Sequence, residues 1–224
     1  MTLLSTAELD QLITTVEAPN TAEELLRATQ ELARGCPQLA SGSAERQRAM
    51  ACLINLLKAN NPGAAIAAVD GLVGCGADAV EPLLNNIDAR NYGARAWAVR
   101  ALAGIGDARG LAVLDEAARD DVGPSVRRAA ARGLGTLALD ALPQEQRHTM
   151  QQQCLAGLSQ TCQDAEWVVR YAAMVGLESL VSPSLTADAR QQALQLLQQH
   201  SQSEHEDTLV VRLRALQALE RLSA

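Results

Sequence analysis

Aromatic and arginine side chains stand together in two short segments of the chain, which are Tyr92, Arg95, Trp97 and Arg100 in the first and Trp167, Arg170 and Tyr171 in the second. With two Trp, two Tyr and no Phe in the chain, these segments hold all of its Trp and Tyr rings. Aromatic faces stack on planar groups and guanidinium forks bind carboxylates, so both segments are candidate binding surfaces. The alternative is that the rings only fill the core.

A further basic group lies between the two segments. Arg128 and Arg132 are four residues apart, so they share one face of a helix, and Arg127 precedes them. Such a face could hold carboxylates. The alternative is that these arginines belong to an ordinary solvated face.

Residues for metal or nucleophilic chemistry are sparse. His148 lies six residues before Cys154, a poor spacing for two ligands on one helix, and His205-Glu206 is a single His-Glu dipeptide in a polar stretch. We expect no metal site. The sequence also lacks a GxGxxG after a strand, a P-loop and a GxSxG motif.

The elements that position these residues form a repeat. Segments 94–105, 126–137, 169–180 and 211–222 align without gaps, and a weaker copy covers 64–75. Arg95, Arg127, Arg170 and Arg212 are equivalent. Each copy has apolar residues at helical spacing, so it predicts a helix. Other predicted helices precede the copies, at about 43–59, 79–88, 109–119, 145–162 and 187–200.

Two helices in a period of about 30 to 43 residues predict an all-α fold, an α-solenoid of about five HEAT-like helical pairs. Predicted helices at about 5–17 and 20–34 make 1–40 an N-terminal helical cap, and 41–224 is expected to form one continuous repeat array. The low content of aromatic residues also favours helices over sheets, because strands are enriched in them.

Each repeat arginine is preceded by an acidic residue, namely Asp88, Asp120 or Asp121, Asp164 and Asp207. Such pairs bridge successive turns of a solenoid and cap helix starts. We call Arg95, Arg127, Arg170 and Arg212 the arginine ladder. For each of them the sequence favours a structural role, with ligand binding as the alternative.

Composition and charge indicate the protein's compartment and which partners it does not bind. A formal charge of −7 disfavours binding to nucleic acid, and the lack of an uninterrupted apolar run of about 18 residues or of a signal sequence predicts a cytoplasmic protein without a membrane partner. Five widely spaced cysteines are expected to be reduced, several as small core residues.

Three stretches of the repeat contain residue patterns that a HEAT-like fold alone does not require. Residues 91–111 (NYGARAWAVRALAGIGDARGL), 123–135 (GPSVRRAAARGLG) and 166–180 (EWVVRYAAMVGLESL) resemble the F-type subunit of the E/F phycobilin lyase family, in the family's order. The resemblance is close over about 90–180 and looser in the flanks.

This resemblance implies a subunit that works as a heterodimer with an E-type partner. The pair attaches an open-chain tetrapyrrole, usually phycocyanobilin, through a thioether to a cysteine of a phycobiliprotein α subunit, usually that of phycocyanin. The bilin is the substrate and no cofactor is implied. Isomerising relatives carry a His-Cys motif, which the polar loop 200–207 lacks. The alternatives are a noncatalytic scaffold or chaperone for phycobiliprotein assembly and a HEAT adaptor unrelated to pigments.

A bilin is planar and carries two propionates, which suits aromatic walls and arginine clamps. Under the resemblance, the candidate ligand-binding residues are Tyr92, Arg95, Trp97, Arg100, Arg128, Arg132, Trp167, Arg170 and Tyr171, on the concave face lined by the second helices. Candidate acids for thiol addition are Asp120, Asp121 and Glu166, which could instead cap helices. The last helix, about 207–222, offers Val211, Leu213, Leu216 and Leu219 for core and partner contacts.

Overall fold

The computed structural model describes residues 4–87 and 90–223. Within these ranges the regular structure consists of α-helices and short 3-10 turns, without a strand, so the predicted all-α repeat fold is confirmed. The chain forms two compact units, residues 1–105 and 106–224. The predicted division into a cap, 1–40, and an array, 41–224, stays a prediction.

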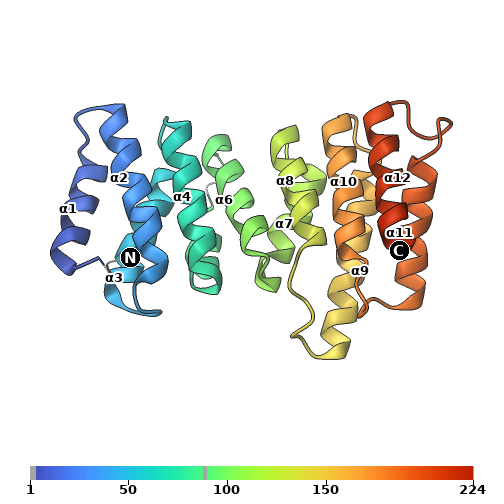
Figure 1. The fold of residues 1–224 in the computed structure, drawn as a ribbon, viewed down its shortest axis with the longest axis horizontal. Helices are drawn as coiled ribbons and strands as arrows, with labels where there is room; N and C mark the ends of the chain where they lie inside the picture. Colours follow the sequence, from blue (N-terminus) through green and yellow to red (C-terminus); the bar gives the residue numbers. More distant parts are fainter. Residues whose placement is uncertain (1–3, 88–89, 224) are drawn as a thin grey trace. The chain divides into compact units, whose positions relative to one another are not determined.

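The first unit contains α1 (Thr6–Glu17), α2 (Ala22–Gly35), α3 (Ala44–Leu56), α4 (Pro62–Cys75), α5 (Val80–Leu84) and α6 (Tyr92–Ile105). Helix α1 packs on α2 and α3 packs on α4, while α2, α4 and α6 contact one another in succession (Figure 1). The pair α1/α2 therefore occupies the place of a repeat in this unit.

The second unit contains α7 (Leu111–Asp120), α8 (Pro124–Gly135), α9 (Gln144–Thr161), α10 (Trp167–Leu180), α11 (Ala187–His200) and α12 (Leu209–Ser223). The second helices of its pairs, α8, α10 and α12, form one layer, and α7, α9 and α11 form the other (Figure 1). Each pair thus buries its apolar stripe against the neighbouring pairs, as in a solenoid.

Most predicted helices lie within a few residues of the observed ones, but the helix expected at 79–88 is much shorter. Helix α5 ends at Leu84, and the preceding 3-10 turn, Gly76–Ala79, starts at a glycine with φ of 60°. Such a φ suits glycine and ends α4 there. The predicted range also includes Asp88, which lies outside the described residues.

Glycine sets the spacing between α8 and α10. A Cβ atom at Gly135 would overlap the backbone of Gly176, and one at Gly176 would lie 2.6 Å from the carbonyl oxygen of Ala131. The two backbones therefore approach closely only because both positions are glycine. This contact brings the outer surfaces of α8 and α10 next to each other.

One stretch, Pro62–Leu84, is long and apolar enough to cross a membrane by length and composition, with a mean hydropathy of 1.4. It is interrupted after Cys75 by the 3-10 turn, and 56% of the 18-residue window that is apolar enough is buried inside the protein. Most of its apolar residues are core residues of the first unit, although Ile66 is exposed.

Candidate functional site: the outer surface of α8 and α10

The arginine ladder joins each second helix to the loop of the following repeat. Arg127 of α8 donates two hydrogen bonds to the carboxylate of Asp164, with N–O distances of 2.6 and 2.9 Å, and a third to the carbonyl oxygen of Asp121 at 2.8 Å. The carboxylate raises the pKa of Arg127. Burial raises the pKa of Asp164, but the bonds from Arg127 outweigh it and leave the pKa lowered. Arg127 is therefore a structural link between repeats.

The next step of the ladder differs from the expected one. Arg170 of α10 binds both carboxylate oxygens of Glu206 at 2.7 Å, and it reaches the expected partner, Asp207, with a single contact of 3.0 Å. The Glu206 side chain is 1% exposed, whereas that of Asp207 is 90% exposed. Burial alone would raise the pKa of Glu206, but the bonds from Arg170 lower it to about 2. The acid of the His205-Glu206 dipeptide is thus the main ladder carboxylate.

Every guanidinium nitrogen of Arg170 has an acceptor, because Nη1 also donates to the carbonyl oxygens of Asp164 and Ala165. Arg170 was a candidate ligand-binding residue. In this arrangement Arg170 fixes the start of α10. The helix in turn positions Trp167 and Tyr171, the two aromatic residues that flank Arg170 in sequence.

In the first unit, α6 carries the first aromatic and arginine segment. Tyr92 is 44% exposed, and the Arg95 guanidinium lies 5.7 Å from its ring centre. Arg100 lies at the same distance from the ring of Trp97, so each ring carries a cation on its face. The expected partner of Arg95 in the ladder, Asp88, lies outside the described residues.

In the second unit, Trp167 begins α10 at the repeat position that Tyr92 has in α6, and it is 46% exposed. Tyr171, one turn later, is half-buried. The two aromatic side chains are therefore surface residues that stand on a buried helix, and Trp167 is not the core filler that a large apolar residue usually is.

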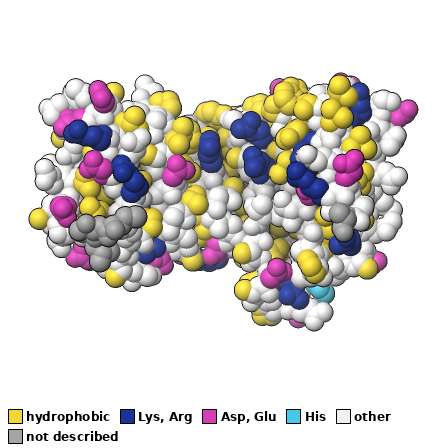
Figure 2. All heavy atoms as spheres, viewed as in Figure 1, with side chains coloured by type: hydrophobic (Ala, Val, Ile, Leu, Met, Phe, Trp, Pro, Cys, Tyr) yellow, Lys and Arg dark blue, Asp and Glu magenta, His cyan; other side chains and the backbone are white. Residues whose placement is uncertain are grey.

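Arg128 and Arg132 lie on the neighbouring helix, α8, and both are exposed. Neither makes a hydrogen bond or ion pair with another residue that the structure describes. Arg132 has the repeat position of Arg100, and Arg128 that of Tyr171. Figure 2 shows basic side chains gathered near α8 and hydrophobic ones at the N-terminal ends of α8, α10 and α12. We call Arg128, Arg132, Trp167 and Tyr171 the α8–α10 surface.

The three candidate acids lie in different settings. Asp121 accepts a hydrogen bond from the backbone N–H of Gly123 at 2.8 Å, so it orders the turn before α8. Asp120 ends α7 and lines a groove on the other layer, beside Met150 of α9. Glu166 precedes Trp167 directly, is exposed, and makes no side-chain capping bond. Of the three, only Glu166 adjoins the α8–α10 surface in sequence.

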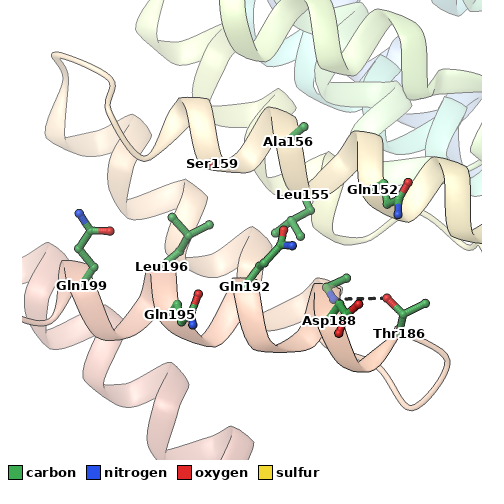
Figure 3. A pocket seen from close by; sticks show the side chains of 11 residues that line it. Gln152, Leu155, Ala156, Ser159, Thr186, Asp188, Gln192, Gln195, Leu196 and Gln199 are labelled. Atoms are coloured by element: carbon green, nitrogen blue, oxygen red, sulfur yellow. Dashed lines mark hydrogen bonds between the residues drawn. The ribbon is translucent and has the colours of Figure 1, made fainter.

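A groove of about 710 Å³ lies between α9 and α11, and no predicted site residue lines it (Figure 3). Its wall includes four glutamines, Gln152, Gln192, Gln195 and Gln199. The groove has one charged side chain, Asp188, which would repel an anionic ligand. The second groove, between α7 and α9, has two arginines, but Arg119 pairs with Asp115 and Arg109 with Asp107. The α8–α10 surface therefore offers the better anion site.

Metal ligands are not grouped in the described part of the chain, since no three His, Cys, Asp or Glu side chains there could hold an ion. All five cysteines are free and buried, as expected for core residues.

The fold and these surfaces define an α-solenoid with a basic and aromatic surface on its second helices. A family model described as HEAT repeats matches residues 42–135. A designed armadillo repeat protein, 21% identical with a TM-score of 0.57, shares the fold alone.

Proteins of similar sequence identify the family more narrowly than the fold does. The chain is 50% identical, over 78% of each protein, to "Phycocyanin alpha phycocyanobilin lyase CpcF" of Synechocystis sp., and 40% identical to "Bilin biosynthesis protein RpcF" of Synechococcus sp., over 96% of this chain and 97% of the relative. A solved structure of "the complex of CpcE and CpcF of phycocyanin lyase" from Nostoc sp. is 43% identical with a TM-score of 0.68, covering 76% of this chain and 97% of that one. The chain belongs to the F-type subunits of the phycobilin lyase family, as its sequence motifs predicted.

Proposed function

We propose that this chain is the F-type subunit of a heterodimeric lyase, which binds an open-chain tetrapyrrole and attaches it by a thioether to a cysteine of a phycobiliprotein α subunit. The relatives named as phycocyanobilin lyases and the related CpcE–CpcF complex support this function. They favour phycocyanobilin as the bilin, α-phycocyanin as the acceptor and an E-type subunit as the partner. We also propose that the protein works in the cytoplasm and needs no cofactor.

The observation that supports the site is a pair of unpaired cations on the helix that packs beside the exposed Trp167 and the half-buried Tyr171. Arg128 and Arg132 have no carboxylate partner among the described residues, and the packing of α8 on α10 places their helix beside Trp167 and Tyr171. Two propionates of a bilin would bind the two guanidinium groups, and its conjugated rings would stack on the aromatic side chains. The segment on α6, with Tyr92, Arg95, Trp97 and Arg100, is proposed as a second bilin-contacting surface.

In this proposal the lyase accelerates attachment chiefly by orientation. The acceptor thiol adds to the ethylidene group of ring A: a C–S bond forms, the C=C double bond opens, and a proton completes the addition. Holding the bilin in one pose selects one face of that double bond. Glu166 is the best placed candidate for the proton donor, because it is exposed and precedes Trp167. Asp121 is engaged in its turn, and Asp120 lines the other layer.

A scaffold or chaperone for phycobiliprotein assembly is the second function. It would use the same surfaces for protein contacts, without bilin chemistry. Coexpression of this chain with its E-type partner, a source of bilin and α-phycocyanin separates the two, with zinc-induced fluorescence of the acceptor as the readout. A fluorescent acceptor supports the lyase, whereas an acceptor that stays colourless although the three proteins associate favours the scaffold.

A further inference from the structure

Two of the five cysteines lie side by side in the first unit. Cys36 follows α2 in the 3-10 turn Cys36–Gln38, and Cys75 is the last residue of α4. Their sulfur atoms are 3.3 Å apart and share a hydrogen bond, although 39 positions separate the residues in the chain. A disulfide bond is about 2.0 Å long, so a small change in side-chain torsion would bring these sulfurs within bonding distance. Neither cysteine is used in the proposed bilin chemistry.

The packing of α4 on the turn after α2 produces this pairing. A Cβ atom at Gly74 would lie 2.7 Å from Cγ of Pro37. The turn therefore approaches the helix closely because the position on α4 is glycine. Pro37 and Gly74 are the chain neighbours of Cys36 and Cys75, so their contact sets the two sulfur atoms against each other.

A buried arginine holds both segments that carry the cysteines. Arg46 of α3 donates one hydrogen bond to the carbonyl oxygen of Cys75, at 2.9 Å, and another to that of Leu39, at 3.0 Å. Ser41 also donates a hydrogen bond to the carboxylate of Asp78 at 2.7 Å, so the two loops beyond the cysteines are joined. These bonds keep the two sulfur atoms together in the folded protein.

The two thiols differ chemically. The hydrogen bond from Cys36 and the positive charge of Arg46 lower the pKa of Cys75, whereas the same hydrogen bond and burial raise the pKa of Cys36. Cys75 is therefore the better thiolate, and Cys36 donates the proton in their contact. The thiolate is the form of cysteine that attacks oxidants. Cys75 is also the more accessible of the two, at 4% exposed against 0% for Cys36.

We propose that Cys36 and Cys75 are a redox-active pair, which a hydroperoxide oxidises to an intramolecular disulfide bond. The Cys75 thiolate attacks the terminal oxygen of the hydroperoxide: an S–O bond forms, the O–O bond breaks, and the leaving oxygen anion takes up a proton. The Cys36 thiol then attacks the sulfur of this sulfenic acid, so that the S–S bond forms and the hydroxyl group leaves with the thiol proton as water.

The disulfide bond ties the end of α2 to the end of α4 across α3. Such a link restricts the unfolded chain and so stabilises the first unit against unfolding. A dithiol reverses the reaction by thiol–disulfide exchange, in which the dithiol is oxidised to its own disulfide and both cysteines return to thiols.

The test counts thiols by mass spectrometry in the full chain, which is treated with hydrogen peroxide, unfolded in an alkylating reagent and digested without reductant. The free thiols should fall from five to three, with one cross-linked peptide that joins Cys36 to Cys75, and dithiothreitol should restore all five. The oxidised chain should unfold at a higher urea concentration than the reduced one. Cys52→Ala is the matched control, because Cys52 is a buried cysteine of the same unit, and it should form the same cross-link.

Single variants separate the roles of the two thiols. Cys36→Ala removes the thiol that resolves the sulfenic acid, so Cys75 should react with the sulfenic acid probe dimedone. In Cys75→Ala, Cys36 should stay unmodified. Labelling of Cys36 in the second variant, without labelling of Cys75 in the first, would overturn the proposed order of attack.

Five free thiols in the wild-type chain after peroxide treatment would overturn the proposal. So would a cross-link between any other two cysteines, or oxidation of Cys75 to a sulfinic acid without a disulfide bond. The wild-type chain decides these outcomes, so they do not depend on the folding of an alanine variant.

Discussion

Arg170 and Glu206 form a two-pronged ion pair between successive repeats, with both N–O distances at 2.7 Å and both side chains largely buried. The same arginine also binds the loop that precedes its own helix. One side chain therefore fixes the start of α10 to its own turn and to the next one. Trp167 and Tyr171, which flank Arg170 in sequence, depend on this link for their position.

Breaking that link should destabilise the second unit. Arg170→Ala leaves the Glu206 carboxylate buried without its partner, so we expect the free energy of unfolding to fall by about 3–5 kcal/mol in urea titrations. The control is Arg132→Ala, which removes an exposed arginine and should change it by less than about 0.5 kcal/mol. Equal stability of the two variants would contradict the structural role of Arg170.

The same cluster predicts how stability depends on pH. Burial lowers the pKa of His200, which is 2% exposed and lies 3.6 Å from Glu206, so the folded protein keeps it neutral while the unfolded chain protonates below about pH 6.5. Stability should therefore decrease as pH falls through that value. Glu206, with a pKa of about 2 against an ordinary 4.5, adds a second loss between about pH 4.5 and 2.

Urea midpoints measured from pH 8 to 3 test both steps. His200→Gln should remove the first loss and keep the second. A wild-type profile in His200→Gln would show that His200 does not titrate with unfolding.

The close approach of α8 and α10 predicts that Gly135→Ala is costly. The added methyl group overlaps the backbone of Gly176, so we expect a loss of about 1–3 kcal/mol and weaker bilin attachment, because the two site helices are forced apart. Gly93→Ala in α6 is the control, since its nearest neighbour would be 3.6 Å away. It should be neutral or slightly stabilising in the same unfolding assay.

Much of this arrangement could be predicted from the sequence, because the repeat positions of Arg127, Arg170 and Arg212 mark the second helices directly. The choice between Glu206 and Asp207 could not, since two neighbouring acids in a loop have no periodic pattern that shows which one turns inward. The groove between α9 and α11 was also missed, because its glutamines resemble any solvated helix face. Conversely, the spacing of Arg128 and Arg132 predicted that they share one helix face, and the packing leaves both side chains exposed.

Thiol reactivity tests the burial of the cysteines. Burial raises the pKa of Cys52 to about 11 and that of Cys154 and Cys162 to about 12. At pH 8 these thiols are protonated and shielded, so a disulfide reagent such as DTNB should label them only after unfolding. Rapid labelling of the native protein would contradict the described core.

The central claim is that the α8–α10 surface of this chain binds the bilin. The most direct measurement is the bilin affinity of the purified heterodimer, by absorbance titration, for the wild type and for Arg128→Ala combined with Arg132→Ala. Both arginines are exposed and unpaired among the described residues, so the double variant should keep its helical signal and its E-type partner while its bilin affinity falls by about tenfold or more. An unchanged affinity and attachment rate in an intact heterodimer would contradict the claim and move the site to another surface.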